Sequence, residues 1–353
     1  MVLTIVSVFV LLTLGVVEFC LHNTHVGKIP VRILVNGTRG KTTVTRLIAS
    51  GLRESGLKVL AKTTGSEAAI LMPDGTVQSL KRRFGVNVLR ETFGFFSLAN
   101  RLNVQAVVLE CMALRPENQI LMCRMTRPTV SVITNARVDH TDVMGESIAS
   151  SAQVLKLSVP ENYSFYTSDI FFADDSSAVV VNAGPSPAER NKALVLRILK
   201  DLGVPESTAV SGMAKAVPDI GLTGPFRFED RLIINAFASN DMQSARELLT
   251  SIGSLKDVCI IYNNRSDREF RLKFFAEVFR ELSCPRIIVI GDNLSKCVRF
   301  FKRKVPSSSV SPFIGTDSEL LSLCGSTTVC MGNIKGRGTA FVEFCRKNGQ
   351  EVR

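Results

Sequence analysis

Apolar and polar positions along the chain predict strands and helices in turn. Residues 31–36, 104–110 and 129–135 are short runs rich in β-branched and other apolar side chains, and each is followed by a polar or helical stretch. Residues 41–56 have the amphipathic pattern of a helix that ends at a glycine. Short apolar runs that alternate with helices are typical of a parallel sheet covered on both faces, so we expect an α/β fold.

A second alternating set of strands and helices begins near residue 231. We therefore expect two domains, the first over residues 28–225 and a smaller, Rossmann-like α/β domain over residues 226–353. The glycines and prolines of 206–230 predict a connection between them. Residues 63–95 show no clear period and hold a probable turn, "MPDGT", so we interpret them as an excursion from the first sheet.

The N-terminal residues 1–17 are apolar apart from Thr and Ser, and as a helix they would extend about 25 Å. A cleaved signal peptide would have a basic start and a small-residue cleavage site, and neither is clear. A buried core helix would normally show one polar side. We therefore predict a single-pass membrane anchor. Because Lys28 and Arg32 follow the span and no basic side chain precedes it, the rest of the chain is expected in the cytoplasm.

The 353-residue chain has a formal net charge of +11, which is compatible with nucleic acid, an anionic membrane surface or an acidic substrate as a partner. With no Trp and three Tyr, the sequence shows no base-stacking pattern, so we expect no nucleic-acid partner. Nine cysteines without a C-x-x-C motif are interpreted as reduced and mostly buried thiols of a cytosolic fold.

The stretch "GTRGKTT" at residues 37–43 joins a predicted strand to a predicted helix. A glycine loop at a helix N-terminus can hold an anion with backbone N–H groups; Lys41 would reach the outer phosphates and Thr42 would place its hydroxyl on Mg²⁺. The longer phosphate-loop pattern needs a glycine where this chain has Val35. The alternative is an ordinary strand-to-helix turn with a cap.

Two further predicted strands also end in polar side chains. Glu110 follows one apolar run, and another leads into Asn135, Asp139, His140 and Asp142. Carboxyl ends of parallel strands form the rim where open α/β sheets bind ligands, and such side chains suit a metal or phosphate. Each group alone could be a solvated strand end or a structural histidine. Together with the loop, they predict one site at one edge of the sheet.

The segments "NGTRGKTT", "LECMA" and "NARVDHTDVMG", in this order and spacing, resemble the Mur ligase superfamily of ATP-dependent amide-forming ligases, whose loop is the shorter G-T-x-G-K-[ST]. The N-terminal apolar segment and "KTTG", "NAFASND", "NNRSDR" and "GNIKG" are similar to one branch, the ligase subunits of poly-γ-glutamate synthases. The resemblance covers most of the chain and is patchier over 160–225. It implies a Mur-ligase-like central domain with a parallel sheet.

The resemblance also implies site residues and cofactors, namely ATP and Mg²⁺. The residues implied to bind the nucleotide phosphates are Gly37, Thr38, Arg39, Gly40, Lys41, Thr42 and Thr43. Those implied as metal ligands are Thr42, Glu110 and His140, and the implied catalytic residues are Lys41, Glu110 and His140. Arg227 resembles the arginine of the family's R-x-E element beside the nucleotide. Asn240 and Asp241 resemble a segment near the adenosine.

Other residues keep alternative interpretations. Lys156 lies near the place of the carbamoylated lysine of many Mur ligases, but about one helical turn out of register, so it either supports the metals or is a solvated helix residue. Cys111 is interpreted as packing, because the implied reaction needs no covalent enzyme nucleophile. Eight further residues are candidates for positioning substrate. Three of them otherwise simply end a strand, namely Lys62, Thr63 and Thr64. The other five otherwise form a solvated basic surface, namely Lys81, Arg82, Arg83, Arg265 and Arg268.

The implied reaction activates a glutamate γ-carboxylate as an acyl phosphate and joins it to a glutamate amine. Implied partners are glutamate, the growing poly-γ-glutamate chain, the membrane and other membrane subunits of the synthase, and a homo-oligomer is compatible with the sequence. The alternatives are a folylpolyglutamate-synthase-like or cell-wall ligase with a soluble substrate, a P-loop ATPase of a membrane export system, and a nucleotide-binding scaffold without turnover.

Overall fold

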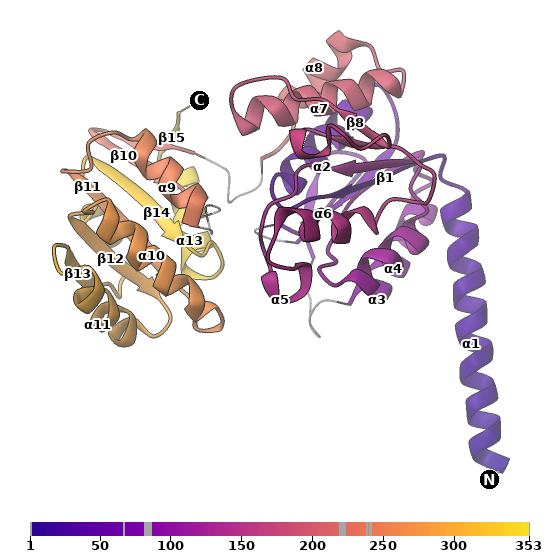
Figure 1. Cartoon of the computed structure of the whole chain (residues 1–353), viewed down its shortest axis with the longest axis horizontal. Helices are drawn as coiled ribbons and strands as arrows, with labels where there is room; N and C mark the ends of the chain where they lie inside the picture. Colours follow the sequence, from indigo (N-terminus) through magenta and orange to yellow (C-terminus); the bar gives the residue numbers. More distant parts are fainter. Residues whose placement is uncertain are drawn as a thin grey trace. The chain divides into compact units, whose positions relative to one another are not determined.

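The computed structural model describes residues 2–65, 68–80, 87–218, 224–237, 239 and 242–352. The chain forms two compact units, Met1–Val217 and Pro218–Arg353, each with its own sheet (Figure 1).

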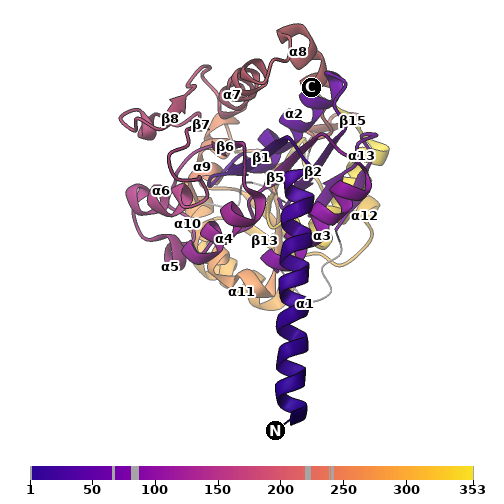
Figure 2. The ribbon, with the colours of Figure 1, turned by 90° about the vertical axis from the view of Figure 1, so that its right-hand side faces the viewer.

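Helix α1 (Val2–Gly27) projects from the first unit (Figure 2). Its residues 2–21 are exposed, whereas His22 and Val26 are buried against the unit. His22 Nε2 lies 2.8 Å from Met125 O, and its ring meets Phe93 edge-on. Within the described residues, α1 is the one helix long and apolar enough to cross a membrane, a property that signal sequences share. It extends well past the expected 1–17 span.

The sheet of the first unit has the order β4-β3-β2-β5-β1-β6-β7-β8. Its strands are β1 (Val31–Asn36), β2 (Val59–Thr63), β3 (Ala69–Leu71), β4 (Val77–Ser79), β5 (Ala106–Glu110), β6 (Val130–Ile133), β7 (Phe165–Thr167) and β8 (Ala178–Val180). The pairs from β2 through β8 in this order are parallel, as expected, while β3 and β4 pair antiparallel. The interpretation of 63–95 as an excursion from the sheet was therefore wrong: the "MPDGT" turn closes a hairpin that extends it.

Alternating side chains of β1 face two helical layers. Ile33 and Val35 pack with α2 (Lys41–Glu54), α7 (Pro187–Asp201) and α8 (Glu206–Ala214). Leu34 packs on the other face with α3 (Val88–Arg101) and α4 (Pro116–Thr126). The two-residue repeat of a strand thus buries both faces of the sheet. Helices α5 (Thr141–Met144), α6 (Ile148–Lys156) and η1 (Ile170–Phe172) pack beside β6 and β7.

The predicted connection over 206–230 was wrong at its start, because α8 occupies residues 206–214. Helix α8 packs closely on α2: a Cβ atom at Gly212 would lie 2.7 Å from Ser50 O, and Ser50 Oγ donates to Gly212 O at 2.6 Å. Gly212 is therefore the place where the two helices approach each other.

The second unit holds a sheet of order β13-β12-β11-β14-β10-β9-β15. Its strands are β9 (Phe226–Phe228), β10 (Arg231–Asn235), β11 (Val258–Asn264), β12 (Arg286–Gly291), β13 (Ser309–Pro312), β14 (Thr327–Gly332) and β15 (Gln350–Glu351). Strands β10 to β14 are parallel, and β9 and β15 join antiparallel at the edge.

Helices cover both faces of this second sheet. They are α9 (Met242–Ser251), η3 (Ser266–Arg268), α10 (Glu269–Glu281), α11 (Leu294–Lys304), α12 (Asp317–Ser322) and α13 (Arg337–Asn348). Phe275 of α10 and Phe301 of α11 pack in one apolar core, and Leu320 of α12 and Phe341 of α13 pack in the other. The α/β architecture with a Rossmann-like second unit is confirmed. All nine cysteines are free and seven are buried, as predicted.

Candidate active site

The loop between β1 and α2 needs glycine at two positions. Gly37 has φ +124°, and a Cβ atom there would lie 2.1 Å from Thr134 Oγ1. Gly40 has φ +83° and precedes the first residue of α2, and a Cβ atom there would lie 2.9 Å from Asn191 Nδ2 of α7. Positive φ and close neighbours together exclude an unstrained side chain at either position. The loop therefore approaches its surroundings with its backbone.

Residues that follow β6 hold this loop in place. Asn135 Oδ1 accepts from Thr38 Oγ1 at 2.8 Å and from Arg39 N at 3.0 Å, while its Nδ2 donates to Arg39 O at 3.0 Å. Thr134 Oγ1 donates to the same Arg39 carbonyl at 2.6 Å. Because these polar groups are satisfied by the neighbouring strand end, the loop is preformed.

Helix α2 begins directly at the loop. Its first intrahelical bond runs from Val44 N to Gly40 O at 2.9 Å, so the N–H groups of Lys41, Thr42 and Thr43 precede the hydrogen-bond ladder at the positive end of the helix dipole. Such N–H groups can hold phosphate oxygens. The arrangement fits the anion-binding loop that the sequence predicts.

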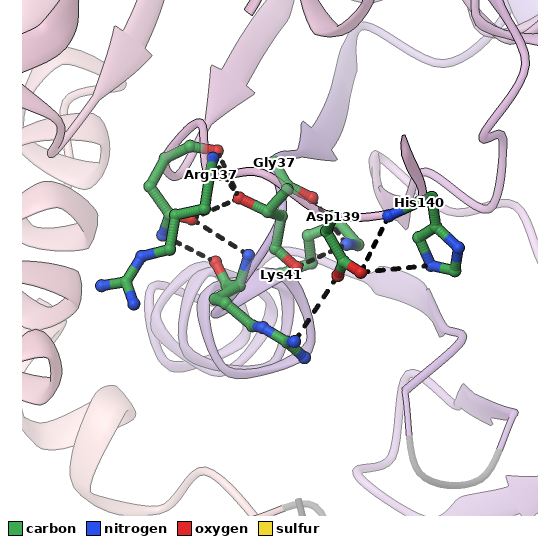
Figure 3. Close-up of polar contacts among 8 residues, drawn as sticks. Gly37, Lys41, Arg137, Asp139 and His140 are labelled. Atoms are coloured by element: carbon green, nitrogen blue, oxygen red, sulfur yellow. Dashed lines mark hydrogen bonds and ion pairs between the residues drawn. The ribbon is translucent and has the colours of Figure 1, made fainter. Parts of the chain in front are cut away.

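The Lys41 side chain folds back over the loop. Its Nζ donates to Gly37 O at 2.6 Å and to Thr38 O at 3.3 Å, and Figure 3 shows the amine turned toward the loop carbonyl groups. Burial lowers the pKa of Lys41, and the nearby Glu110 carboxylate opposes that shift. The cation is thus held at the loop, within reach of an anion bound there.

Glu110, the last residue of β5, lies at the same edge of the sheet as Thr42. It is 2% exposed, and its Oε2 accepts from Thr42 Oγ1 at 2.9 Å and from Thr64 N at 2.7 Å. The contact arises because β5 pairs in parallel with both β1 and β2, so that the carboxyl ends of all three strands meet. A buried carboxylate is therefore beside the first turn of the phosphate-loop helix.

These oxygens suit a hard divalent cation. A hydroxyl and a carboxylate are the ligand types that Mg²⁺ prefers, and Mg²⁺ usually takes few protein ligands and completes its shell with water and phosphate oxygens. Among the residues that the structure describes, no group of three or more His, Cys, Asp or Glu side chains could hold a metal ion. Thr42 and Glu110 therefore fit a metal that also takes oxygen ligands from water and a bound nucleotide.

His140 lies after β6, next to Asp139 and directly before α5. It has φ +49° at the start of α5, and its backbone N donates to Asp139 Oδ1 at 3.0 Å, with its Nε2 3.9 Å from the same oxygen. Asp139 Oδ2 lies 3.5 Å from Arg39 Nη2. In Figure 3, Asp139 lies between the loop and His140, and the guanidinium of Arg137 points away from the other labelled side chains. Asp142 is exposed on α5.

Two amide side chains where the loop begins, Asn36 and Gln119, were not predicted from the sequence. Asn36 Oδ1 accepts from Gly37 N, and its Nδ2 donates at 2.8 Å to both Gln119 Oε1 and Ser158 Oγ. An amide as the last residue of an apolar strand could have flagged Asn36. Gln119, which is fully buried on α4, has no local signal, because only the fold brings it beside β1.

Cys111 lies directly after Glu110 and is buried. Its Sγ donates to Gln119 Oε1 at 3.3 Å, and burial raises the pKa of the thiol to about 11. A protonated thiol is a poor nucleophile at neutral pH. The geometry therefore agrees with the interpretation of Cys111 as packing.

Two lysines considered from the sequence have carboxylate partners. Lys62 of β2 is buried, and its Nζ lies 2.7 Å from Glu91 Oε2 of α3. Lys156 of α6 lies 2.5 Å from Asp175 Oδ2 and its side chain is 42% exposed. The pair involving Lys156 fits a solvated helix residue. Thr63 is fully buried beside Lys62, while Thr64 contributes its backbone N–H to Glu110.

Of the candidates predicted in the second unit, the structure describes Arg227, Arg265 and Arg268. Arg227 is exposed on β9. Arg265 and Arg268 contact Asp267, with N–O distances of 2.7 Å and 3.9 Å. Asn240 and Asp241, and the basic cluster Lys81, Arg82 and Arg83, lie outside the residues that the structure describes.

Comparison of the chain with known families matches both units. The Mur ligase middle domain matches residues 35–184, and the poly-gamma-glutamate synthase CapB C-terminal domain matches residues 224–348. PGA synthase CapB of Bacillus subtilis (strain 168) is 30% identical, with 97% of this chain and 96% of that protein covered. Capsule biosynthesis protein CapB of Bacillus anthracis is 28% identical, with 95% and 80% covered.

Solved structures show the same fold at low sequence identity. Folylpolyglutamate synthase from Thermotoga maritima has a TM-score of 0.67 at 14% identity, covering 93% of this chain and 92% of that one. FolC from E. coli, solved in complex with DHPP and ADP, gives 0.67 at 14%, covering 94% and 92%. The bifunctional folylpolyglutamate synthase/dihydrofolate synthase from Yersinia pestis, complexed with AMPPNP and a Mn ion, gives 0.65 at 14%, covering 92% and 90%.

A Mur-type fold with a glycine loop and a strand-end carboxylate defines the class of ATP-dependent amide ligases. Within that class, this chain belongs to the CapB family of poly-γ-glutamate synthases. The family and the enzyme class predicted from the sequence are thereby confirmed, and structures of this fold bind adenine nucleotides and a divalent metal.

Proposed function

We propose that this chain uses ATP to join the γ-carboxylate of one glutamate to the amine of another and so builds poly-γ-glutamate. The observation that carries the proposal is the contact of Thr42 with Glu110 at the Lys41 loop, in a chain of the CapB family. The named activity of the Bacillus subtilis relative, PGA synthase, points to the same product.

The first unit supplies the phosphate site. The N–H groups at the start of α2 and the backbone of the Gly37–Gly40 loop hold the ATP phosphates, and Lys41 turns from its loop carbonyl partners to the γ-phosphate. Thr42 and Glu110 hold Mg²⁺, which when bound offsets the negative charge of the phosphate oxygens.

The chemistry follows from the poor reactivity of a carboxylate. An oxygen of the glutamate γ-carboxylate attacks the γ-phosphorus of ATP, ADP leaves, and an acyl phosphate forms. The amine of the second glutamate attacks the acyl carbon and loses a proton, and phosphate departs with the transferred oxygen. The chain's contribution is to position the reactants and to stabilise charge, since no enzyme nucleophile takes part.

Further residues are assigned to this reaction as part of the proposal. His140, held next to Asp139, would bind a second metal or help hold its water. Arg227, on β9, and Asn240 are assigned to nucleotide binding. The basic side chains Arg265 and Arg268 and the net charge of +11 attract an acidic polymer.

Helix α1 is proposed to anchor the enzyme in the cell membrane, with both units in the cytoplasm. Its exposed residues 2–21 would extend about 30 Å as a helix, which is about the thickness of the bilayer hydrocarbon. Burial of His22 and Val26 then fastens the first unit to the end of the span. Anchoring fits a polymer made beside the other membrane subunits of a synthase.

The proposal is tested with the full chain in nanodiscs, supplied with ATP, Mg²⁺ and L- or D-glutamate, by following ADP release and the linkage of the product. We expect glutamate-dependent ADP and a γ-linked polymer, and Lys41→Ala should abolish both. Turnover only with a folate substrate supports a folylpolyglutamate-type ligase, and turnover indifferent to glutamate supports an export ATPase. Either result contradicts the proposal.

A further inference from the structure

Lys62 is a charged side chain in an unusual place. It lies within β2 with a side chain that is 1% exposed. Transfer of an ammonium group out of water is costly unless a partner of opposite charge lies close, and here Glu91 Oε2 lies 2.7 Å from Lys62 Nζ. The Glu91 side chain is itself only 12% exposed. A buried ion pair is weak evidence for stability, so its place in the fold is the informative feature.

That place is the end of the strand beside Glu110. The β2–β5 ladder ends with Lys62 beside Leu109, while Thr63 still pairs with Ala69 of β3 and Glu110 with Val35 of β1. Thr64 follows the last paired residue of β2. There Thr64 N donates to Glu110 Oε2 at 2.7 Å, the same oxygen that accepts from Thr42. Thr64 thus lies outside the strand pairing, yet its backbone N–H donates a hydrogen bond to the Glu110 carboxylate.

The ion pair ties this strand end to a rigid support. Glu91 lies in the first turn of α3, which is capped by Asn87 Oδ1 accepting from Arg90 N at 2.9 Å. Helix α3 packs through Phe95 and Phe96 on the sheet face beneath the site. Lys62 Nζ also donates to Met112 Sδ at 3.8 Å, two residues past Glu110. Lys62 of β2 thus contacts both α3 and the segment that follows Glu110.

We propose that Lys62 and Glu91 are positioning residues for the ligase reaction: their buried contact fixes the end of β2 so that the Thr64 N–H aims Glu110 at Thr42. The inference rests on the proposed role of Glu110 and Thr42 as metal ligands. Lys62 does not touch substrate, because its ammonium group is enclosed by α3 and the β5 end. Replacing a residue that orients a metal ligand without touching the metal typically weakens metal binding about 10- to 100-fold.

The test measures metal binding without turnover. Full-length protein in nanodiscs is titrated with Mn²⁺ in the presence of ADP, and free Mn²⁺ is followed by electron paramagnetic resonance. We expect Lys62→Met and Glu91→Gln each to weaken Mn²⁺ binding about tenfold. Lys58→Met, the same change at an exposed lysine just before β2, should leave binding unchanged. The KM for glutamate should stay near that of the wild type in all three variants.

A double variant, Lys62→Met with Glu91→Met, separates positioning from folding. Removing both charges together leaves neither Lys62 nor Glu91 as an ion without the other, so the melting temperature should recover relative to the single variants. Mn²⁺ binding should stay weakened, because no charge-assisted bond then holds the strand end. If the double variant regains wild-type Mn²⁺ binding, the pair serves the fold alone and the inference is wrong.

The remaining outcomes separate the inference from the function on which it rests. If Glu110→Gln loses Mn²⁺ binding while Lys62→Met binds as the wild type does, Glu110 is a ligand but Lys62 does not position it. A raised KM for glutamate in Lys62→Met with unchanged Mn²⁺ binding would show contact with substrate instead. If Glu110→Gln binds Mn²⁺ normally, the proposed metal site itself is wrong.

Discussion

Thr42 Oγ1 lies 2.9 Å from Glu110 Oε2, although 68 residues separate them in the chain. The contact follows from topology, since β1 and β5 are parallel neighbours and the loop that leaves β1 turns directly into α2. The Thr42 hydroxyl and the Glu110 carboxylate are thereby close enough to bind the same metal ion. They lie beside Lys41, which would face the γ-phosphate. This pair joins the fold to the proposed chemistry.

Replacing Glu110 by Gln removes the charge and keeps the shape of the side chain. We expect kcat to fall about 100-fold or more, and the Mg²⁺ concentration for half-maximal turnover to rise, because a neutral amide binds a hard cation weakly. The measurement is ADP release across a Mg²⁺ titration. An unchanged Mg²⁺ dependence would show that Glu110 is not a ligand.

Lys41→Met should remove ATP turnover while the protein remains folded. The Lys41 ammonium contacts the loop carbonyl groups, and its loss deprives the transferring phosphate of a fixed positive charge, worth about 100- to 1000-fold in rate. Lys58→Met, at an exposed site before β2, is the matched control and should keep full turnover. Equal activity of both variants would exclude Lys41 from phosphate transfer.

Gly37→Ala should destabilise the first unit more than Gly56→Ala. Both glycines have positive φ, so each alanine brings strain of about 1–2 kcal/mol. Only at Gly37 would the added Cβ atom also collide, with Thr134 Oγ1 at 2.1 Å, whereas Gly56 has open space; the collision adds about 1–3 kcal/mol. Denaturant unfolding of the two variants measures the difference, and equal stability would contradict the described packing of the loop.

Cys111→Ser should keep most of the ligase activity. Burial raises the pKa of Cys111 to about 11, so the thiol stays protonated at neutral pH and its thiolate fraction grows only as the pH approaches 11. Alkylation at pH 7, mapped by mass spectrometry, should spare Cys111 in the folded protein and mark it after the protein is unfolded. Rapid labelling of Cys111 together with loss of activity in the serine variant would indicate a nucleophile.

The sequence predicts the fold best where it contains clear runs of apolar residues. The strands around Ile33, Val108 and Ile260 have unbroken apolar runs, which is why both sheets could be predicted. Strands β3 and β4 have three residues each, too few to show a two-residue period. Helix α8 was missed because its weakly amphipathic sequence was interpreted as a connection, and only packing on α2 defines it.

For the site, sequence order predicted which residues would meet but not how they are held. The loop after β1, which leads to Lys41, and the end of β5 at Glu110 could be brought together by topology alone. The burial of Lys62 could not be foreseen, because a lysine at a strand end usually remains in water and its partner Glu91 is distant in the chain. His140 was expected to be a metal ligand itself, and the structure places it against Asp139.

The central claim is that ATP activates a carboxylate of glutamate. The most direct test supplies glutamate labelled with ¹⁸O in the γ-carboxylate to the full-length protein in nanodiscs with ATP and Mg²⁺, and analyses the released phosphate by mass spectrometry. The account predicts one ¹⁸O atom transferred to each phosphate released with amide formation, because the departing phosphate carries the carboxylate oxygen. Phosphate formed without ¹⁸O while γ-linked product accumulates, or ATP hydrolysis that proceeds equally without glutamate, would contradict it.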